Sequence, residues 1–172
     1  MNSKPFALLI SSILLLAGTC TLADTGTRSV ETEVVISAGP DAVLQAFLDG
    51  DDLKAWWKVS RSLVESKAGG VWSITWDDWG PEKTQHAWIG VIEELTANRL
   101  VIGQLVMVEP GMPLLGPMQL EITTAANDSG TLLHLSHSGY RSGQHWDTMY
   151  DAVVKGWDHV LGDMQVWFQE GY

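Results

Sequence analysis

The sequence predicts an α+β fold in which a curved antiparallel sheet wraps around a long C-terminal helix. The first observation is a series of short segments with alternating apolar and polar residues, separated by turn residues, which is typical of an antiparallel meander. The second is that apolar residues recur every three or four positions from Trp146 to Phe168, which predicts an amphipathic helix of about 25 residues. The apolar face of this helix needs a sheet to cover it, and a length of 172 residues fits one domain.

A strand and two short helices are predicted before the meander. Residues 29–38 alternate between apolar and polar side chains, so they form a half-buried strand. Pro40 then suits the first turn of a helix that continues over 42–48. The acidic residues at 49–52 form a turn and cap a second short helix over 53–57, since they lack the ligand spacing of a calcium-binding loop.

The central part of the chain is predicted to form six further strands. Short turns that contain Gly, Asn or Asp join most of them, so neighbouring strands run antiparallel and no βαβ unit is expected. The segment 110–117 is an apolar loop rich in Pro and Gly, which would serve either as a lid over a cavity or as a passive connection. The predicted strands cover residues 62–65, 71–77, 86–95, 100–108, 118–126 and 131–138, with a turn at 78–82.

The first residues have the features of a secretory signal peptide. Lys4 precedes an apolar run over 6–17, and small and polar residues then lead to Ala23. The run is too short to favour a membrane span, and retention as an N-terminal anchor is the alternative. We expect cleavage after Ala23 and a periplasmic or secreted protein with no membrane span. The predicted organisation is a signal peptide (1–23), a flexible N-terminus (24–29) and one domain (30–172).

Cys20 is the only cysteine of the chain. The residues before it resemble a lipoprotein signal, but Thr19 occupies the position where Gly or Ala normally precedes an acylated cysteine. Lipidation through Cys20 is therefore the less favoured interpretation. Cleavage after Ala23 would remove Cys20, so the mature domain would have neither a disulfide nor a reactive thiol.

The composition excludes some classes of partner. The formal net charge is −11 and no stripe of Lys and Arg is present, so nucleic acids and anionic membrane surfaces are poor partners. Hydrophobic residues make up 45% of the chain, which is enough to bury a core. The nine tryptophans suit either an aromatic-walled cavity or an ordinary core that is rich in Trp.

Several short segments, in their order and spacing, resemble the START/SRPBCC superfamily. They are Ala46-Phe47, Trp56-Trp57, Gly69-Gly70-Val71-Trp72, residues 90–101, residues 131–139 and Gly156-Trp157. Together they cover most of residues 30–168, and they are most similar to the activator of Hsp90 ATPase homologue 1-like (AHSA1-like) branch. The resemblance implies a helix-grip (Bet v 1-like) fold, whose cavity between sheet and helix holds lipids, polyketides, hormones or other apolar molecules.

The resemblance also implies a range of activities. Some members of the superfamily are cyclases, hydrolases or dehydratases. The Hsp90-activating branch binds a cytosolic chaperone, a role that does not fit a secretory signal. Because one fold serves many functions, the resemblance alone does not select a ligand.

The five histidines do not have the spacing of a metal site, and no metal or cofactor is expected. His134 and His137 are three residues apart on a predicted strand, so their side chains face opposite sides. His145 and His159 lie far apart along the predicted helix, and His86 lies at a strand start. His137 is expected to point inward. It is either a polar anchor or general base for a ligand, or a hydrogen-bonded core histidine, which we favour.

A cavity between the predicted sheet and the C-terminal helix is the candidate binding site. Tryptophans from adjacent strands and from the helix would form its walls, unless they fill the space as ordinary core. Gln104, Tyr140 and His137 would supply orienting polar groups, and Gly156 would let the helix approach the sheet. The predicted ligand-binding residues are Trp72, Trp76, Trp88, Gln104, Met118, Leu120, His137, Trp157, Leu161 and Met164.

These features lead to three hypotheses of function. The favoured one is an exported, non-enzymatic protein that binds an apolar small molecule or lipid. The second is an enzyme on the same scaffold, a cyclase or hydrolase that uses His137. The third is a protein-interaction module, by analogy with the chaperone-activating branch. Glu93 and Glu121 are expected to face solvent, so a catalytic pair of carboxylates is disfavoured.

Overall fold

The predicted sheet, the long helix and the two short helices are all present in the structure. The computed structural model describes residues 27–79 and 83–171, so the predicted signal peptide lies outside the described residues. The first strand begins at Arg28, one residue before the start of the strand predicted over 29–38. The elements are β1 (Arg28–Ile36), α1 (Pro40–Gln45), α2 (Gly50–Trp57), β2 (Arg61–Val64), β3 (Val71–Trp79), β4 (Thr84–Leu95), β5 (Arg99–Val108), β6 (Leu115–Asn127), β7 (Gly130–Tyr140) and α3 (Gln144–Gln169).

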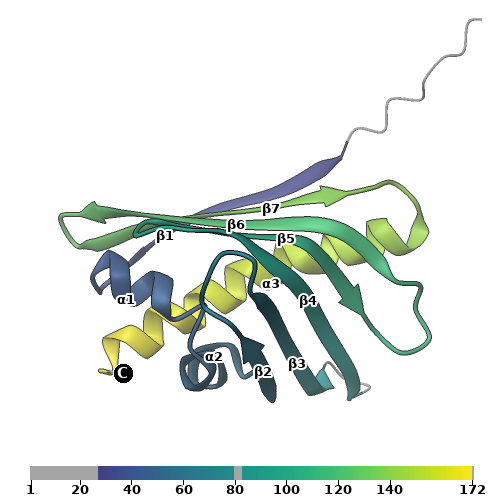
Figure 1. Ribbon diagram of the computed structural model, residues 1–172, viewed down its shortest axis with the longest axis horizontal. Coiled ribbons are helices and arrows are strands. Elements are labelled where there is room, and N and C mark those ends of the chain that lie inside the picture. The colour runs from purple at the N-terminus through teal and green to yellow at the C-terminus, as the bar shows by residue number, and fades with distance from the viewer. Residues whose placement is uncertain (1–26, 80–82, 172) are drawn as a thin grey trace, which may run out of the picture.

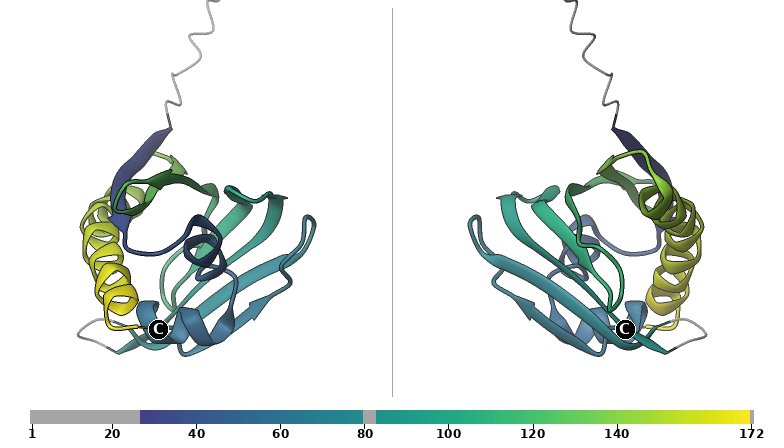
Figure 2. Two further views of the ribbon diagram at one scale, coloured as in Figure 1. Left: turned by 90° about the vertical axis from the view of Figure 1, so that its left-hand side faces the viewer. Right: turned by 90° about the vertical axis from the view of Figure 1, so that its right-hand side faces the viewer.

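The strands form one antiparallel sheet in the order β1-β7-β6-β5-β4-β3-β2. Consecutive strands from β2 to β7 are neighbours, which confirms the predicted meander, and β1 pairs with β7 at one edge. Figure 1 shows the sheet arching over α3, with α1 and α2 beneath it near the C-terminal end of α3. In Figure 2, α3 lies along the open side of the arch. This is the α+β helix-grip architecture that the sequence predicts.

Several predicted boundaries differ from the structure, and the ends of two strands matter most for the site. β3 runs on to Trp79, through the residues expected to begin a turn, because Trp79 pairs with Thr84 of β4 after an irregular step in the register. β6 begins at Leu115, inside the predicted loop 110–117, because Leu115 pairs with Met107 of β5 and is buried. The connection between β5 and β6 is therefore shorter than predicted.

The turn between β2 and β3 requires two glycines, as predicted. Gly69 has a φ of +78°, in the region that side chains rarely adopt. A Cβ on Gly70 would lie 2.0 Å from the carbonyl oxygen of Glu65, so no side chain fits there. The N–H of Gly69 also donates to the oxygen of Ile92 at 2.8 Å, which fixes this turn against β4.

α3 is an amphipathic helix of 26 residues, close to the predicted length. Its buried face packs in the arch of the sheet, and its opposite face is exposed. Two of its side chains reach the outer edge of β1: Tyr150 Oη donates to the Ser29 oxygen at 3.1 Å, and Gln165 Nε2 donates to the Val35 oxygen at 3.0 Å. Within the described part of the chain, no helix has the length and apolarity that crossing a bilayer requires.

An aromatic cluster ties the two short helices to the sheet. The ring of Trp57 lies 5.0 Å from that of Trp56 and 6.2 Å from that of Trp72. The indole N–H groups of Trp56 and Trp72 donate to the oxygens of Ala46 and Phe47 at 2.9 and 2.8 Å. These bonds satisfy the one polar group of each buried indole, so the indoles pack without leaving a donor unpaired. The cluster places the end of α2 against the concave face of β3.

Candidate ligand-binding site

A cavity of about 500 Å³ lies between the sheet and α3. Small-molecule sites usually measure about 300–1,000 Å³, so its size suits a ligand. Its walls come from the end of α2, from β3 and β4, from the segment after β5 and from one face of α3. The lining residues are Trp57, Trp76, Thr84, His86, Trp88, Glu109, Met112, Thr148, Met149, Ala152, Val153, Gly156, Trp157 and Val160.

Four indole rings meet at this cavity. Trp76 and Trp88 face it because alternate residues of a strand point to the same side, and both are buried. From the ring of Trp57, the centroids of the other three indoles lie 5.1–5.6 Å away. The sequence predicted Trp76, Trp88 and Trp157 as site residues. Trp57 was missed as a lining residue, because only the packing of α2 against the sheet brings it there.

The helical wall comes from one stripe of α3. Met149, Val153 and Val160 belong to the apolar period seen in the sequence, and Gly156 lies among them. The prediction that Gly156 lets the helix approach the sheet is wrong. A Cβ on Gly156 would have no neighbouring heavy atom within 4 Å. The missing side chain therefore enlarges the cavity.

The cavity has one polar end, built by Thr84, His86 and Glu109. Trp88 Nε1 donates to His86 Nε2 at 2.8 Å, so the remaining proton of a neutral His86 is on Nδ1, which lies 3.6 Å from Glu109 Oε2. Burial lowers the pKa of His86, against the opposing effect of the Glu109 charge. Thr84 Oγ1 lies 3.5 Å from Glu109 Oε1. His86 is therefore a neutral imidazole beside a carboxylate at neutral pH.

The sequence did not single out the residues of this polar end. His86 lies two residues before Trp88, so strand alternation alone places both on the inner face. Glu109 follows β5, and the pairing of Ala87 with Val108 brings it beside His86. Because this pairing depends on the irregular register of β4 with β5, the spacing of residues in the sequence does not reveal it.

His137 faces inward as predicted, but it does not line the cavity. Its Nδ1 lies 3.3 Å from Trp157 Nε1 and 2.9 Å from Tyr140 Oη. An indole N–H can only donate, so Nδ1 is the acceptor and Nε2 carries the proton. Burial lowers the pKa of His137 to about 3, and burial also raises that of Tyr140. His137 is thus a positioning residue that orients the Trp157 wall.

The burial of His137 predicts a pH dependence of stability. Its pKa falls from an ordinary 6.5 to about 3 on folding, so between these values the unfolded chain binds a proton that the folded protein does not. The stability that the neutral His137 contributes is fully present above the unfolded-state pKa of 6.5, and it is lost as the pH falls towards the folded-state pKa of about 3. We expect the free energy of unfolding to be about 2 kcal/mol lower near pH 5 than near pH 7. Burial of His86 acts in the same direction. Urea denaturation at both pH values measures this, and equal stabilities would contradict it.

The other predicted site residues fall into two groups. Trp72, Met118, Leu120, Leu161 and Met164 are buried in the core, but the structure does not bring them to the cavity. Gln104 is exposed on the outer face, so its expected inward orientation is wrong. A register shift between Ile102 and Leu105, with a φ of +51° at Gln104, inserts a bulge into β5. The bulge reverses the alternation, so Leu105 rather than Gln104 points inward.

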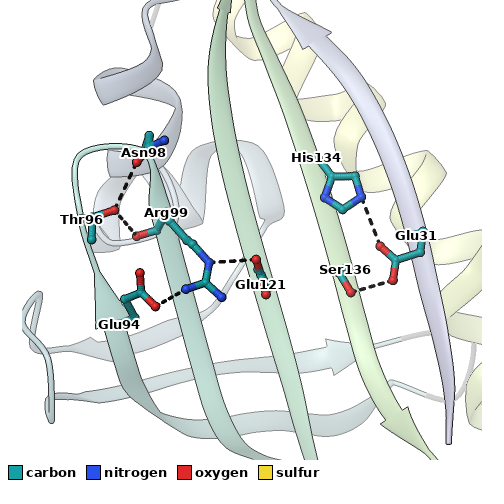
Figure 3. Close-up of polar contacts among 8 residues, drawn as sticks. All are labelled: Glu31, Glu94, Thr96, Asn98, Arg99, Glu121, His134 and Ser136. Carbon is teal, nitrogen blue, oxygen red and sulfur yellow. Dashed lines mark hydrogen bonds and ion pairs between the residues drawn. The ribbon is translucent and has the colours of Figure 1, made fainter.

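Three carboxylates on the outer face of the sheet form ion pairs: Glu31, Glu94 and Glu121 (Figure 3). Arg99 donates to Glu94 and to Glu121, and this contact holds the pKa of Glu121 below its usual range. On the neighbouring strands, Glu31 accepts from Ser136 at 2.7 Å and lies 3.2 Å from His134. These groups lie on the side of the sheet away from the cavity. Among residues 27–79 and 83–171, no three His, Cys, Asp or Glu side chains gather as metal ligands would.

Solved structures of three bacterial proteins share this fold. Protein CV1439 of Chromobacterium violaceum is 23% identical, with 80% of this chain and 94% of that chain covered and a TM-score of 0.64. Protein MLL2253 of Mesorhizobium loti is 17% identical, with 84% of this chain and 99% of that chain covered and a TM-score of 0.67. A protein of Rhizobium leguminosarum is 13% identical, with 84% of this chain and 96% of that chain covered and a TM-score of 0.68. At such identities the likeness shows the fold alone.

The comparison with protein families is more specific. The model described as Activator of Hsp90 ATPase homolog 1-like protein matches residues 37–169. This range includes α1, α2, strands β2 to β7 and α3, and therefore every residue that lines the cavity. No protein with a curated description matches the sequence. The match covers well over half of the chain, and the chain therefore belongs to the AHSA1-like family of the START/SRPBCC superfamily.

Proposed function

We propose that this protein binds an apolar small molecule in the cavity between the sheet and α3. The observation that carries the proposal is the cavity of about 500 Å³, which four indoles and the aliphatic stripe of α3 surround. Proteins of this fold commonly bind hydrophobic ligands. Transfer of an apolar ligand from water to such walls is favourable by about 25 cal/mol for each Å² that it buries.

Binding is favoured over catalysis for a geometric reason. The enzyme hypothesis depends on His137, which is completely buried behind Trp157 and has no place in the cavity lining. Its Nδ1 accepts from Trp157 and Tyr140, so it is not available as a base for a bound molecule. A general base has to reach the proton that it removes. We propose that the protein holds its ligand unchanged, since the histidine on which the enzyme hypothesis depends does not reach a bound molecule.

We propose further that the protein acts outside the cytoplasm. The features that support export are the Lys4 residue, the apolar run over 6–17 and the small residues that lead to Ala23. All of them precede the described domain. In this location the protein would be separated from a cytosolic chaperone, so the activity in the family's description is not proposed for this chain.

Native mass spectrometry of the protein purified from the cell envelope of its own host tests both proposals. We expect an extra mass that is released on denaturation, and a denatured chain that begins at Asp24. The extra mass would identify the ligand class. A bare protein whose tryptophan fluorescence does not respond to fatty acids or aromatic probes would contradict ligand binding. Recovery of the full chain only from the cytoplasm would contradict export.

A further inference from the structure

The polar end of the cavity carries a negative charge. Apart from the His86 imidazole, Glu109 is the only ionisable side chain among the described residues that line the cavity. The Glu109 side chain is 28% exposed, whereas that of His86 is 6% exposed. Indole and aliphatic walls around a carboxylate reduce the effective dielectric constant. The charge therefore acts on a bound group more strongly than a surface charge does.

The protein groups beside Glu109 do not neutralise this charge. The hydroxyl of Thr84, 3.5 Å away, is neutral. The imidazole of His86 is neutral as well, because burial lowers its pKa and Trp88 donates to its Nε2. Among the ion pairs of the described residues, none joins Glu109 to a lysine or arginine. Among residues 27–79 and 83–171, the groups at this site therefore carry an excess of one negative charge.

The walls of the cavity favour a positive group over a negative one. The indole N–H groups of Trp76, Trp88 and Trp157 already donate to protein acceptors, at 3.0, 2.8 and 3.3 Å. The hydroxyl of Thr148 donates to a backbone oxygen of its own helix at 2.9 Å. An anionic ligand would thus meet the like charge of Glu109, and at three of the four indoles and at Thr148 it would meet donors already in use. A cation would meet the carboxylate and the electron-rich indole faces.

We infer that the ligand is an organic cation with an apolar body, whose ammonium-type group lies beside Glu109 and whose apolar part lies among the indoles. This inference rests on the proposed function, because it assigns a ligand class to the same cavity. The inference extends the proposed function by naming which end of the ligand faces β4 and which charge the site selects. Organic amines and quaternary ammonium compounds belong to this class.

Three probes with one common apolar body test the charge selection: phenylbutylamine, phenylbutanol and phenylbutanoate. Titration calorimetry measures their affinities for ligand-free protein at neutral pH and low ionic strength. We expect the amine to bind tightest, about ten-fold tighter than the carboxylate or more, as a partly screened ion pair should give. The alcohol should bind with an intermediate affinity, since it has the same apolar body and no charge.

Two variants separate the role of Glu109 from the overall charge of the protein. Glu109→Gln keeps the shape of the side chain and removes its charge, so the preference for the amine over the alcohol should disappear. Asp158→Asn makes the same change in net charge on the exposed face of α3 and should keep the preference. Equal binding of all three probes, or tightest binding of the carboxylate, would overturn the inference and leave the proposed function standing. If no probe binds, both fail.

Discussion

The substitution His137→Ala should lower the free energy of unfolding by about 3–5 kcal/mol. It removes the common acceptor of Trp157 Nε1 and Tyr140 Oη, which lie 3.3 and 2.9 Å from His137 Nδ1. A buried donor without an acceptor costs about 1–3 kcal/mol, and the lost ring also leaves a cavity in a fully packed region. Urea denaturation followed by circular dichroism at neutral pH measures the loss.

The same strand supplies the matched control. His134 lies three residues before His137 on β7, and its side chain is 38% exposed and contacts Glu31 on the outer face. Exposed ion pairs contribute little to stability, so His134→Ala should lower the free energy of unfolding by less than about 1 kcal/mol. Trp157→Phe, which removes a donor and keeps most of the apolar volume, should cost about 1–2 kcal/mol. Equal and small losses in both histidine variants would show that His137 does not position Trp157.

The second large effect is expected from Gly156→Trp, which should abolish ligand binding while the protein stays folded. A Cβ at this position meets no heavy atom within 4 Å and points into open space, so an indole can enter the cavity of about 500 Å³. We expect the affinity for phenylbutanol to fall by at least about ten-fold. Gly156→Ala should keep binding and raise the free energy of unfolding by about 0.5–1 kcal/mol, because glycine in a helix interior is unfavourable.

Gly162 provides the control on the same helix. A Cβ there also meets no atom within 4 Å, but Gly162 does not line the cavity. Gly162→Trp should therefore leave the affinity for phenylbutanol unchanged. If Gly156→Trp binds the probe as tightly as the parent chain does, the probe occupies some other place, and the proposed site is wrong.

The spacing of apolar residues along the sequence predicted most of the fold and part of the cavity lining. Strand alternation placed Trp76 and Trp88 on the inner face, and the helical period placed Trp157 on the buried side of α3. These predictions hold because each depends only on residues near in sequence. The turn at Gly69 and Gly70 was predictable for the same reason, because the backbone conformation that requires these glycines depends on the neighbouring residues of the turn.

The residues whose positions were predicted wrongly or missed depend on pairing between residues that are distant in the sequence. The bulge in β5 arises from its register with β6, and it turns Gln104 outward although simple alternation points it inward. Glu109 and His86 meet only because two strands pair in an irregular register. Gly156 could either bring two elements together or leave a space between them, and only the path of α3 decides between these outcomes.

The contacts of α3 with the edge of β1 also bear on self-association. An open sheet edge has unpaired carbonyl and amide groups to which another chain can add, and this is a route to aggregation. Tyr150 and Gln165 occupy two of the β1 carbonyl groups, so the long helix covers this edge as well as the core. The opposite edge is β2, whose four residues present only a short template. Both edges of the sheet thus resist the addition of a strand from a second chain.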